Sequence, residues 1–185
     1  MAASRTFETG DSIALVVRQS LEEGKSVEID GLGVFRRGAD GRFQFIPRTA
    51  PRVFLAYVEE DLVAVWRIFK ELAAAGCDPW LDKVKLLPGQ NWPRAIDRAI
   101  SLSDCVVACF SRHAVSKRGF FHSELRYALD CASMLPLDET FLIPVRLEEC
   151  EVPLRITNNL QYVDLFPDFE KGMRRVIAAI RRRKP

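Results

Sequence analysis

The chain has 185 residues, of which 48% are hydrophobic and 28% are charged, and its formal net charge is +2. This composition excludes an intrinsically disordered or collagen-like chain, and the small net charge does not require a nucleic-acid partner. No apolar run reaches the roughly 18 residues that a membrane span needs, and the N-terminus lacks a hydrophobic signal core. We therefore expect a cytoplasmic protein without a membrane partner.

The cysteines are odd in number and form no closely spaced pair. Free thiols in a reducing compartment are the ordinary state of such cysteines. Only two histidines occur and neither lies near a cysteine pair, so no metal site is predicted. The cysteines are Cys77, Cys105, Cys109, Cys131 and Cys150.

A change of pattern near Pro47–Arg52 divides the chain into a small unit of residues 1–48 and a larger domain of residues 51–181. In the small unit, apolar residues at helical spacing follow Asp11 and Ser12, which we expect to cap a helix that Gly24 ends. The apolar residues of this predicted helix are Ile13, Val16, Val17 and Leu21.

Short strand patterns follow this helix. Residues 26–29 and 31–35 are predicted to form one strand with a kink or bulge at the glycines, and a turn at Gly38–Gly41 leads into a further strand over Phe43–Ile46. A unit this small buries too little surface to be stable alone, so we expect it to pack on the rest of the chain or on a second copy.

The larger domain alternates between apolar strands and helical stripes, which predicts an α/β fold with an open, mostly parallel sheet and helices on both faces. Such sheets bind ligands at the carboxyl ends of their strands, which here precede a predicted polar loop over residues 82–91 and the loops after Tyr57 and Phe110. The predicted strands are Val53–Tyr57, Pro79–Leu81, Cys105–Phe110, Phe141–Val145 and Tyr162–Leu165, and the predicted helices are marked by Leu62–Leu72, Trp92–Ile100, Phe120–Cys131 and Met173–Ile180.

Motifs of the common nucleotide-binding and hydrolytic enzymes are missing from the sequence. No Gly-x-Gly-x-x-Gly follows the first strand of the larger domain, and neither a Walker loop nor a Gly-x-Ser-x-Gly elbow occurs. Conventional Rossmann dehydrogenases, kinases and serine hydrolases are therefore excluded.

A series of short motifs in the larger domain resembles a TIR (Toll/interleukin-1 receptor) domain in order and spacing, from Pro51 to Ile180. The resemblance implies a flavodoxin-like, five-stranded parallel sheet. Ala56 replaces the usual Ser of the first strand, and Phe120 stands where the enzymatic members have Trp. The motifs are Val53–Tyr57 with Glu59–Asp61, Trp80–Asp82 with Leu86, Pro88, Gly89 and Trp92, Ser103 and Ser111, Phe120–Leu125, and Ile143–Val145 with Val152 and Pro153.

The resemblance implies one of two activities. Many TIR domains cleave the bond between nicotinamide and ribose in NAD, which is our leading hypothesis, whereas others only recruit further TIR proteins, which is the alternative. Glu124 matches the catalytic glutamate of the enzymatic members. The residues expected to line the NAD pocket are Tyr57, Val58, Asp82, Leu87, Ser111 and Phe120, and those of the assembly loop, the BB loop of the family, are Lys83, Leu86, Pro88, Gly89 and Trp92.

Each of these residues also has an ordinary structural interpretation. Glu124 could be a solvated charge on an amphipathic helix, Phe120 could belong to the core, and Tyr57 could be a buried strand end. Asp82 could cap the loop that follows it, and Lys83 could be a solvated surface charge. The sequence leaves these alternatives open.

The expected chemistry needs no metal and no cofactor beyond NAD itself, which is the substrate. Nicotinamide in NAD is a cationic leaving group, so no strong general acid is required, and one carboxylate beside the ribose can stabilise the oxocarbenium-like transition state. Water then yields ADP-ribose, and an internal nucleophile yields a cyclised product. The sequence does not choose between a glycohydrolase and a cyclase.

The resemblance also implies that activity depends on self-assembly, in bacterial immune or stress signalling. Residues 24–35 and 41–47 resemble the core of the HU/IHF DNA-bending family, but only Arg36–Asp40 stand where that family has a long basic arm. We therefore expect the small unit to mediate self-association or docking, and we do not expect a DNA partner. Residues 181–184 form a basic tail, which is either solvated or part of a nucleic-acid or membrane-surface patch.

Overall fold

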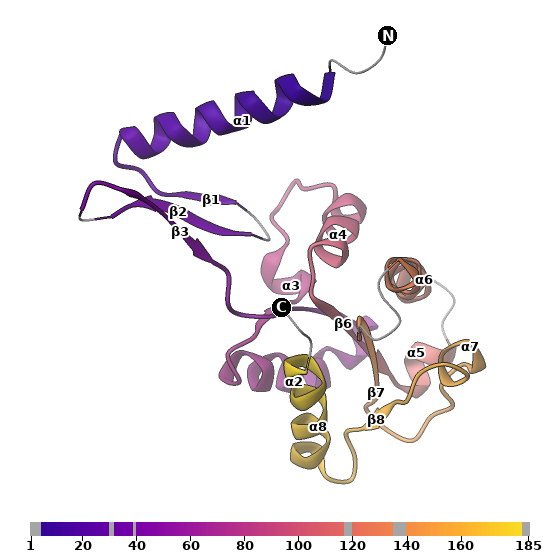
Figure 1. The fold of residues 1–185 in the computed structure, drawn as a ribbon. Helices are drawn as coiled ribbons and strands as arrows, with labels where there is room; N and C mark the ends of the chain where they lie inside the picture. The colour runs from indigo at the N-terminus through magenta and orange to yellow at the C-terminus, as the bar shows by residue number, and fades with distance from the viewer. Residues whose placement is uncertain (1–4, 30–31, 39, 117–119, 135–139, 183–185) are drawn as a thin grey trace. The chain divides into compact units, whose positions relative to one another are not determined.

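In the computed structural model the chain forms two compact units, residues 1–49 and 50–185 (Figure 1). No helix in the described part of the chain is long and apolar enough to cross a membrane. All five cysteines lie in the described part and are free thiols, as expected. The structure describes residues 5–29, 32–38, 40–116, 120–134 and 140–182.

The helix of the small unit, α1, spans Arg5–Glu22 and is longer than predicted. Asp11 and Ser12 lie within it, so the prediction that they cap its start is wrong. The preceding residues contain no proline, and a single glycine inside a helix costs only about 1 kcal/mol, so the backbone continues through them. The end is as expected, because Gly24 follows α1 with a φ of +77°.

Three antiparallel strands complete the small unit, in the order β1 (Val27–Ile29), β2 (Gly33–Arg37), β3 (Phe43–Pro47). The predicted bulge is wrong, because the chain reverses between β1 and β2, where the Leu32 amide donates to Ile29 O at 3.0 Å. Gly33 is needed at the start of β2, since its φ is +149° and an added Cβ would collide with Ile46 O.

The larger unit contains a five-stranded sheet, all of whose strand pairs in the described part of the chain are parallel. The strand order is β5-β4-β6-β7-β8, which confirms the predicted α/β fold with an open parallel sheet. The strands are β4 (Arg52–Ala56), β5 (Asp78–Trp80), β6 (Cys105–Phe110), β7 (Leu142–Arg146) and β8 (Val163–Asp164).

Alternation along the strands builds one core on each face of this sheet. In β4, Val53 and Leu55 enter one buried cluster, and Phe54 and Ala56 enter the other. Helices α2 (Leu62–Ala74) and α8 (Phe169–Arg181) pack on the first face, and α4 (Trp92–Ser101) and α6 (Phe120–Ser133) pack on the second (Figure 1).

Short helical segments were not predicted. The expected polar loop at residues 82–91 begins with a helix, α3, and three further segments of at most five residues occupy other connections. One helical turn is too short to show a periodic apolar stripe, so the sequence pattern does not reveal it. These segments are η1 (Glu59–Asp61), α3 (Asp82–Lys85), α5 (Arg112–Ser116) and α7 (Leu154–Thr157).

Gly172 lets α8 approach the edge of the sheet closely. An added Cβ would lie 2.5 Å from Asp164 O and 2.7 Å from Leu165 Cδ2. Replacing an exposed helical glycine by alanine normally stabilises a helix by about 1 kcal/mol, but here we expect Gly172→Ala to destabilise by about 1–3 kcal/mol. Urea unfolding checks this result, with the exposed Ala178→Gly change as the measure of helix propensity alone. A stabilised Gly172→Ala variant would contradict the close packing.

Candidate active site

The candidate site lies at the carboxyl ends of the central strands. Strand β4 pairs with β5 on one side and with β6 on the other, so the chain leaves β4 at the point where the strand order reverses. Open α/β sheets form their ligand crevice at this point, because the connections on either side diverge to opposite faces. The predicted loops after Tyr57 and Leu81 both start here.

Tyr57 and Asp82 meet at this edge. Tyr57 directly follows β4, Asp82 begins α3 just after β5, and the Tyr57 hydroxyl donates a hydrogen bond of 2.6 Å to Asp82 Oδ1. Both side chains are half-buried. Burial and this contact with Asp82 raise the pKa of Tyr57 well above its ordinary value, so the hydroxyl stays a donor.

Glu124 approaches the same pair from α6. The adjacent Leu125 and, one turn later, Ala128 are buried in the core cluster that also holds Ala56 and Val58, and Glu124 itself is half-buried at the edge of that stripe. The Glu124 carboxylate is near enough to contribute to the raised pKa of Tyr57, and the Asp82 carboxylate is near enough to raise the pKa of Glu124. Burial, followed by the nearby Asp82 carboxylate, raises the pKa of Glu124 to about 8. The structure therefore brings Tyr57, Asp82 and Glu124, three of the residues that the resemblance assigns to the site, to one edge of the sheet.

Lys83 connects the start of the assembly loop to the segment after β4. Its ammonium group lies 2.8 Å from the Glu59 carboxylate, and this hydrogen bond is the main reason that the pKa of Lys83 is raised. Both side chains are exposed, so the pair adds little to stability. It places one cation beside a group of carboxylates.

The remaining assembly-loop residues are mostly open to solvent. Leu87 is 66% exposed and Trp92 is 48% exposed, whereas Leu86 is half-buried. Pro88 and Gly89 are exposed in a turn in which the Gln90 amide donates to Leu87 O at 3.1 Å, and Gly89 has a φ of +84°.

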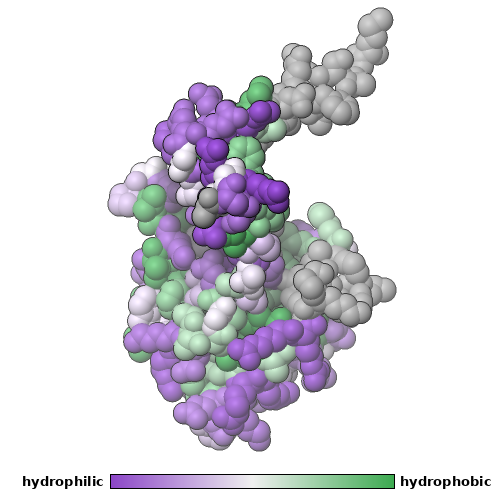
Figure 2. All heavy atoms as spheres, turned by 60° about the vertical axis from the view of Figure 1, so that its left-hand side comes forward, coloured by the Kyte–Doolittle hydropathy of each residue, from purple (hydrophilic) through white to green (hydrophobic). Residues whose placement is uncertain are grey.

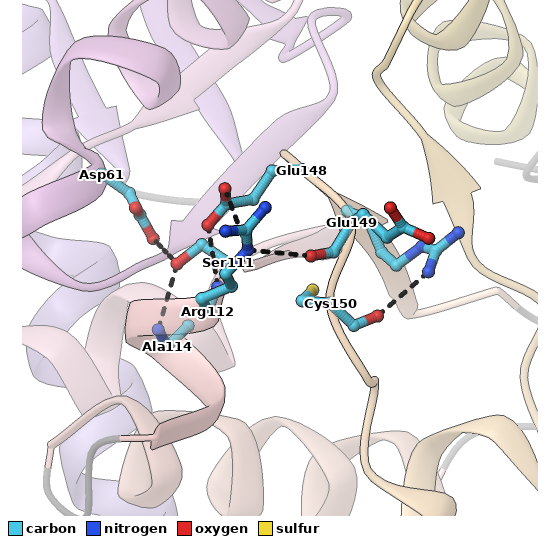
Figure 3. A network of polar contacts seen from close by, with 8 residues as sticks. Asp61, Ser111, Arg112, Ala114, Glu148, Glu149 and Cys150 are labelled. Carbon is cyan, nitrogen blue, oxygen red and sulfur yellow. Dashed lines mark hydrogen bonds and ion pairs between the residues drawn. The ribbon is translucent and has the colours of Figure 1, made fainter.

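Ser111 follows β6 but has a structural environment. Its hydroxyl donates to Asp61 Oδ2 at 2.5 Å and accepts from the Ala114 amide at 3.0 Å, so it joins the start of α2 to the start of α5 (Figure 3). Ser111 is 1% exposed and Asp61 is 8% exposed. Burial raises the pKa of Asp61, and the hydrogen bond from Ser111 opposes the rise. The structure therefore does not present the Ser111 hydroxyl to a ligand in the crevice.

One ion pair and two hydrogen bonds of Arg112 lie next to this buried contact. The Arg112 amide donates to Glu148 Oε1 at 3.0 Å, and the Arg112 guanidinium lies 3.5 Å from the same carboxylate and donates to Glu149 O at 3.3 Å (Figure 3). These contacts connect the end of β6 to the segment after β7.

We expect Ser111→Ala to lower the free energy of unfolding by about 1–3 kcal/mol, because the buried Asp61 carboxylate loses its donor. Urea unfolding near neutral pH checks the value. Ser133→Ala is the control, since Ser133 is exposed and its hydroxyl donates to Asp130 O within its own helix, and it should change stability by less than about 0.5 kcal/mol. Equal effects of the two changes would contradict the role of the buried pair.

Two further residues that were predicted to line the pocket, Val58 and Phe120, are not seen at the site. The Val58 side chain is buried in the core cluster, and its carbonyl accepts from the Asp61 amide at 2.9 Å, so it supports the edge from behind. Phe120 begins α6, but its side chain lies outside the described part of the structure.

Three polar residues at this edge were not predicted as site residues from the sequence. They are Glu59, Asp61 and Arg112. Glu59 and Asp61 belong to an acidic run that a helix start also explains, and Arg112 has no distinguishing neighbour in the sequence. Their contacts join positions 24 to 50 residues apart, which no local pattern reveals.

The assembled site is a half-buried glutamate beside a tyrosine–aspartate pair, bordered by one lysine. Such a carboxylate can stabilise a positive charge that develops on a ligand placed against it. Among the described residues, no group of three or more His, Cys, Asp or Glu side chains is arranged to hold a metal ion.

Comparisons with known proteins agree with this fold. A family model described as TIR domain matches residues 53–177. The protein y4cD of Sinorhizobium fredii (strain NBRC 101917 / NGR234) is 24% identical over 146 residues, which are 79% of this chain but only 22% of that protein. The chain thus spans less than a quarter of the length of this relative. The comparisons give no support to the resemblance of the small unit to HU/IHF proteins.

Two solved structures show the same fold. The TIR domain of the Toll-related receptor TRR-2 from Hydra magnipapillata has a TM-score of 0.54 and 24% identity, covering 68% of this chain and 97% of that one. The TIR domains of the activated Roq1 resistosome, which recognises the pathogen effector XopQ, give a TM-score of 0.57 and 20% identity, covering 71% of this chain and 99% of that one.

Proposed function

The chain belongs to the TIR domain family, and on that basis we propose that it cleaves the nicotinamide–ribose bond of NAD. The observation that carries the proposal is the half-buried Glu124 at the carboxyl edge of the sheet, next to Tyr57 and Asp82. Glu124 is the catalytic residue of this proposal, and NAD is the substrate.

The proposed reaction uses the charge of the substrate. The pyridinium ring of NAD leaves as neutral nicotinamide, and positive charge develops at the ribose C1 as the C–N bond breaks. An ionised Glu124 beside the ribose stabilises this charge. The cationic substrate also favours the ionised form of Glu124, because an opposite charge nearby lowers a carboxyl pKa.

The fate of the ribosyl cation determines the product. Attack by water at C1 gives ADP-ribose and releases one proton, whereas attack by a nucleophile within the ADP-ribosyl group gives a cyclic ADP-ribose species. Both routes release one nicotinamide per NAD. A glycohydrolase and a cyclase are therefore distinguished only by the second product.

We also propose that activity depends on self-assembly, in bacterial immune or stress signalling within the cytoplasm. Exposed apolar side chains of the assembly loop, Leu87 and Trp92, support contacts with another TIR domain. The Roq1 structure places TIR domains in an activated resistosome. The free cysteines support a reducing compartment.

The same exposed side chains support a second candidate, a TIR module that only recruits other TIR proteins. Leu87 and Trp92 would then form the docking surface, and Glu124 would have no chemical role. The two candidates differ in one measurable property, the release of nicotinamide.

The test is to incubate the purified chain with NAD at low and high protein concentration, beside Glu124→Ala. Mass spectrometry identifies the products. Nicotinamide release that rises more steeply than the protein concentration, and that is lost in Glu124→Ala, is the expected result. Equal release by the folded Glu124→Ala variant would overturn the catalytic role of Glu124, and no release at any concentration would favour the recruiting module.

A further inference from the structure

The outer surfaces of α2 and α8 form one continuous face of the larger unit. The buried residues of both helices enter the same core cluster, and Arg181 Nη2 of α8 donates a hydrogen bond of 2.9 Å to Ala75 O at the end of α2. The Arg67 guanidinium of α2 also lies over the Phe169 ring of α8, 4.1 Å from its centre. The two helices lie side by side in Figure 1.

Positive charge is concentrated on this surface, which we call the basic face. Its cations recur on the solvent side of both helices, opposite buried positions such as Ile68 and Val176. Glu71 and Glu170 are the acidic residues exposed on the same two helices, and Asp168 is exposed directly before α8. The exposed cations of the basic face are Arg67, Lys70, Lys171, Arg174, Arg175, Arg181 and Arg182.

Two apolar side chains stand among these cations. Val63 is 82% exposed and Trp66 is 38% exposed, and both lie on the same side of α2 as Lys70, at intervals of three and four residues. The Trp66 ring stacks on Phe69 with 5.0 Å between ring centres, which holds it in place. Solvent-exposed hydrophobic groups are also visible on the surface that Figure 2 shows.

We propose that the basic face binds the anionic headgroups of a lipid surface, with Val63 and Trp66 entering the interfacial layer. Clustered Lys and Arg residues are attracted to anionic lipids, and Trp favours the boundary between headgroups and acyl chains. A nucleic acid would engage the cations but would give Val63 no apolar partner. A second copy docking through the same face would bring like charges together.

This inference is independent of the proposed cleavage of NAD. It concerns a peripheral contact, because no helix of the described chain can span a membrane. It departs from the expectation of no membrane partner, for which a membrane-surface patch at residues 181–184 was only an alternative to a solvated tail. The structure adds the cations of α2 and the exposed Trp66, which come from a segment more than 100 residues away.

Vesicle flotation with the full chain tests the proposal. Vesicles of phosphatidylcholine with phosphatidylserine are compared with vesicles of phosphatidylcholine alone. We expect the wild type to float with the first and not with the second, and Lys70→Glu combined with Arg175→Glu to reduce the bound fraction at least about tenfold, because each cation near an anionic surface contributes severalfold. The matched control is Arg94→Glu combined with Arg126→Glu, which changes the net charge equally on the opposite side of the sheet and should float like the wild type.

Further measurements separate the alternatives. Trp66→Ala should weaken flotation, and added salt should release the wild type, since screening reduces the attraction. Circular dichroism verifies that each variant is folded. The proposal is overturned if the wild type does not float, if it binds both kinds of vesicle equally, or if the control loses binding as strongly as the basic-face variant. Binding to a fluorescent double-stranded oligonucleotide that Trp66→Ala leaves unchanged, without flotation, would assign the face to nucleic acid instead.

Discussion

The Glu124→Gln variant should release nicotinamide at least about 10²-fold more slowly than the wild type and should be the more stable protein in alkaline solution. The loss of activity follows because a neutral amide cannot compensate the positive charge that develops on the ribose, and removal of one such electrostatic contact typically costs two to three orders of magnitude. The gain in stability follows from the raised pKa of Glu124.

The sign of the stability effect is fixed by proton binding. The pKa of the Glu124 carboxyl is the ordinary 4.5 in the unfolded chain and is raised to about 8 in the folded protein, so between these pH values the folded state holds a proton that the unfolded state has lost. The free energy of unfolding therefore falls progressively as the pH rises from about 4.5 to 8. Above that range the contribution of protonated Glu124 to stability is fully lost.

Thermal unfolding at a series of pH values measures this effect. The melting temperatures of Glu124→Gln and wild type should coincide near pH 4 and separate as the pH rises. Above pH 8 the free energies of unfolding should differ by about 2–4 kcal/mol. Asp130→Asn, on the exposed side of the same helix, serves as the control and should show no such divergence. Parallel curves for Glu124→Gln and wild type would show that Glu124 is an ordinary solvated carboxylate.

The pH dependence of NAD cleavage should report the same group. Because ionised Glu124 is the reactive form, kcat/KM should rise with pH and level off with a midpoint near 8. Asp82→Asn removes the neighbouring negative charge and keeps an oxygen that can accept the Tyr57 hydrogen bond, so the midpoint should move down by about one pH unit.

A conservative change nearby provides the comparison. Lys83→Gln alters an exposed residue next to Asp82 whose charge is paired with Glu59, so it should leave the midpoint close to that of the wild type. Steady-state kinetics with a fixed protein concentration measures all three profiles. An Asp82→Asn midpoint that stays in place or moves up would mean that Asp82 does not control Glu124.

The strands and long helices could be predicted because each buries a regular apolar pattern. The continuous apolar run of six residues in β6 predicts a fully buried strand, and every position of β6 is buried. The apolar residues of α2 and α8 recur at helical spacing. The prediction failed where local hydrogen bonds determine the path of the backbone. The reversal between β1 and β2 and the helical turn of α3 depend on local hydrogen bonds that the spacing of apolar residues does not reveal.

The site was predictable to a similar extent. Tyr57 and Asp82 follow adjacent parallel strands, so their meeting follows from topology alone, and Glu124 was assigned by its match to a family motif. Ser111 was placed correctly after β6, yet its burial against Asp61 depends on a contact across 50 residues. A hydroxyl in a buried ion-dipole contact and a hydroxyl in an open pocket look the same in a sequence.

The strand order also constrains how the larger unit forms during synthesis. The first strand of the unit to be made, β4, lies between β5 and β6, and its partner residues on β6 follow 52 residues later in the chain, as Val53 pairs with Cys105. A nascent chain that ends before residue 105 therefore has β4 paired only with the short strand β5, and the other edge of β4 is unpaired. Strand pairs that are so far apart in the sequence form slowly. Until β6 pairs with it, the apolar strand β4 has an open edge that is prone to aggregation. Glu124 follows β6 in the chain. The candidate site is therefore complete only after the residues of β6 that pair with β4 have been made.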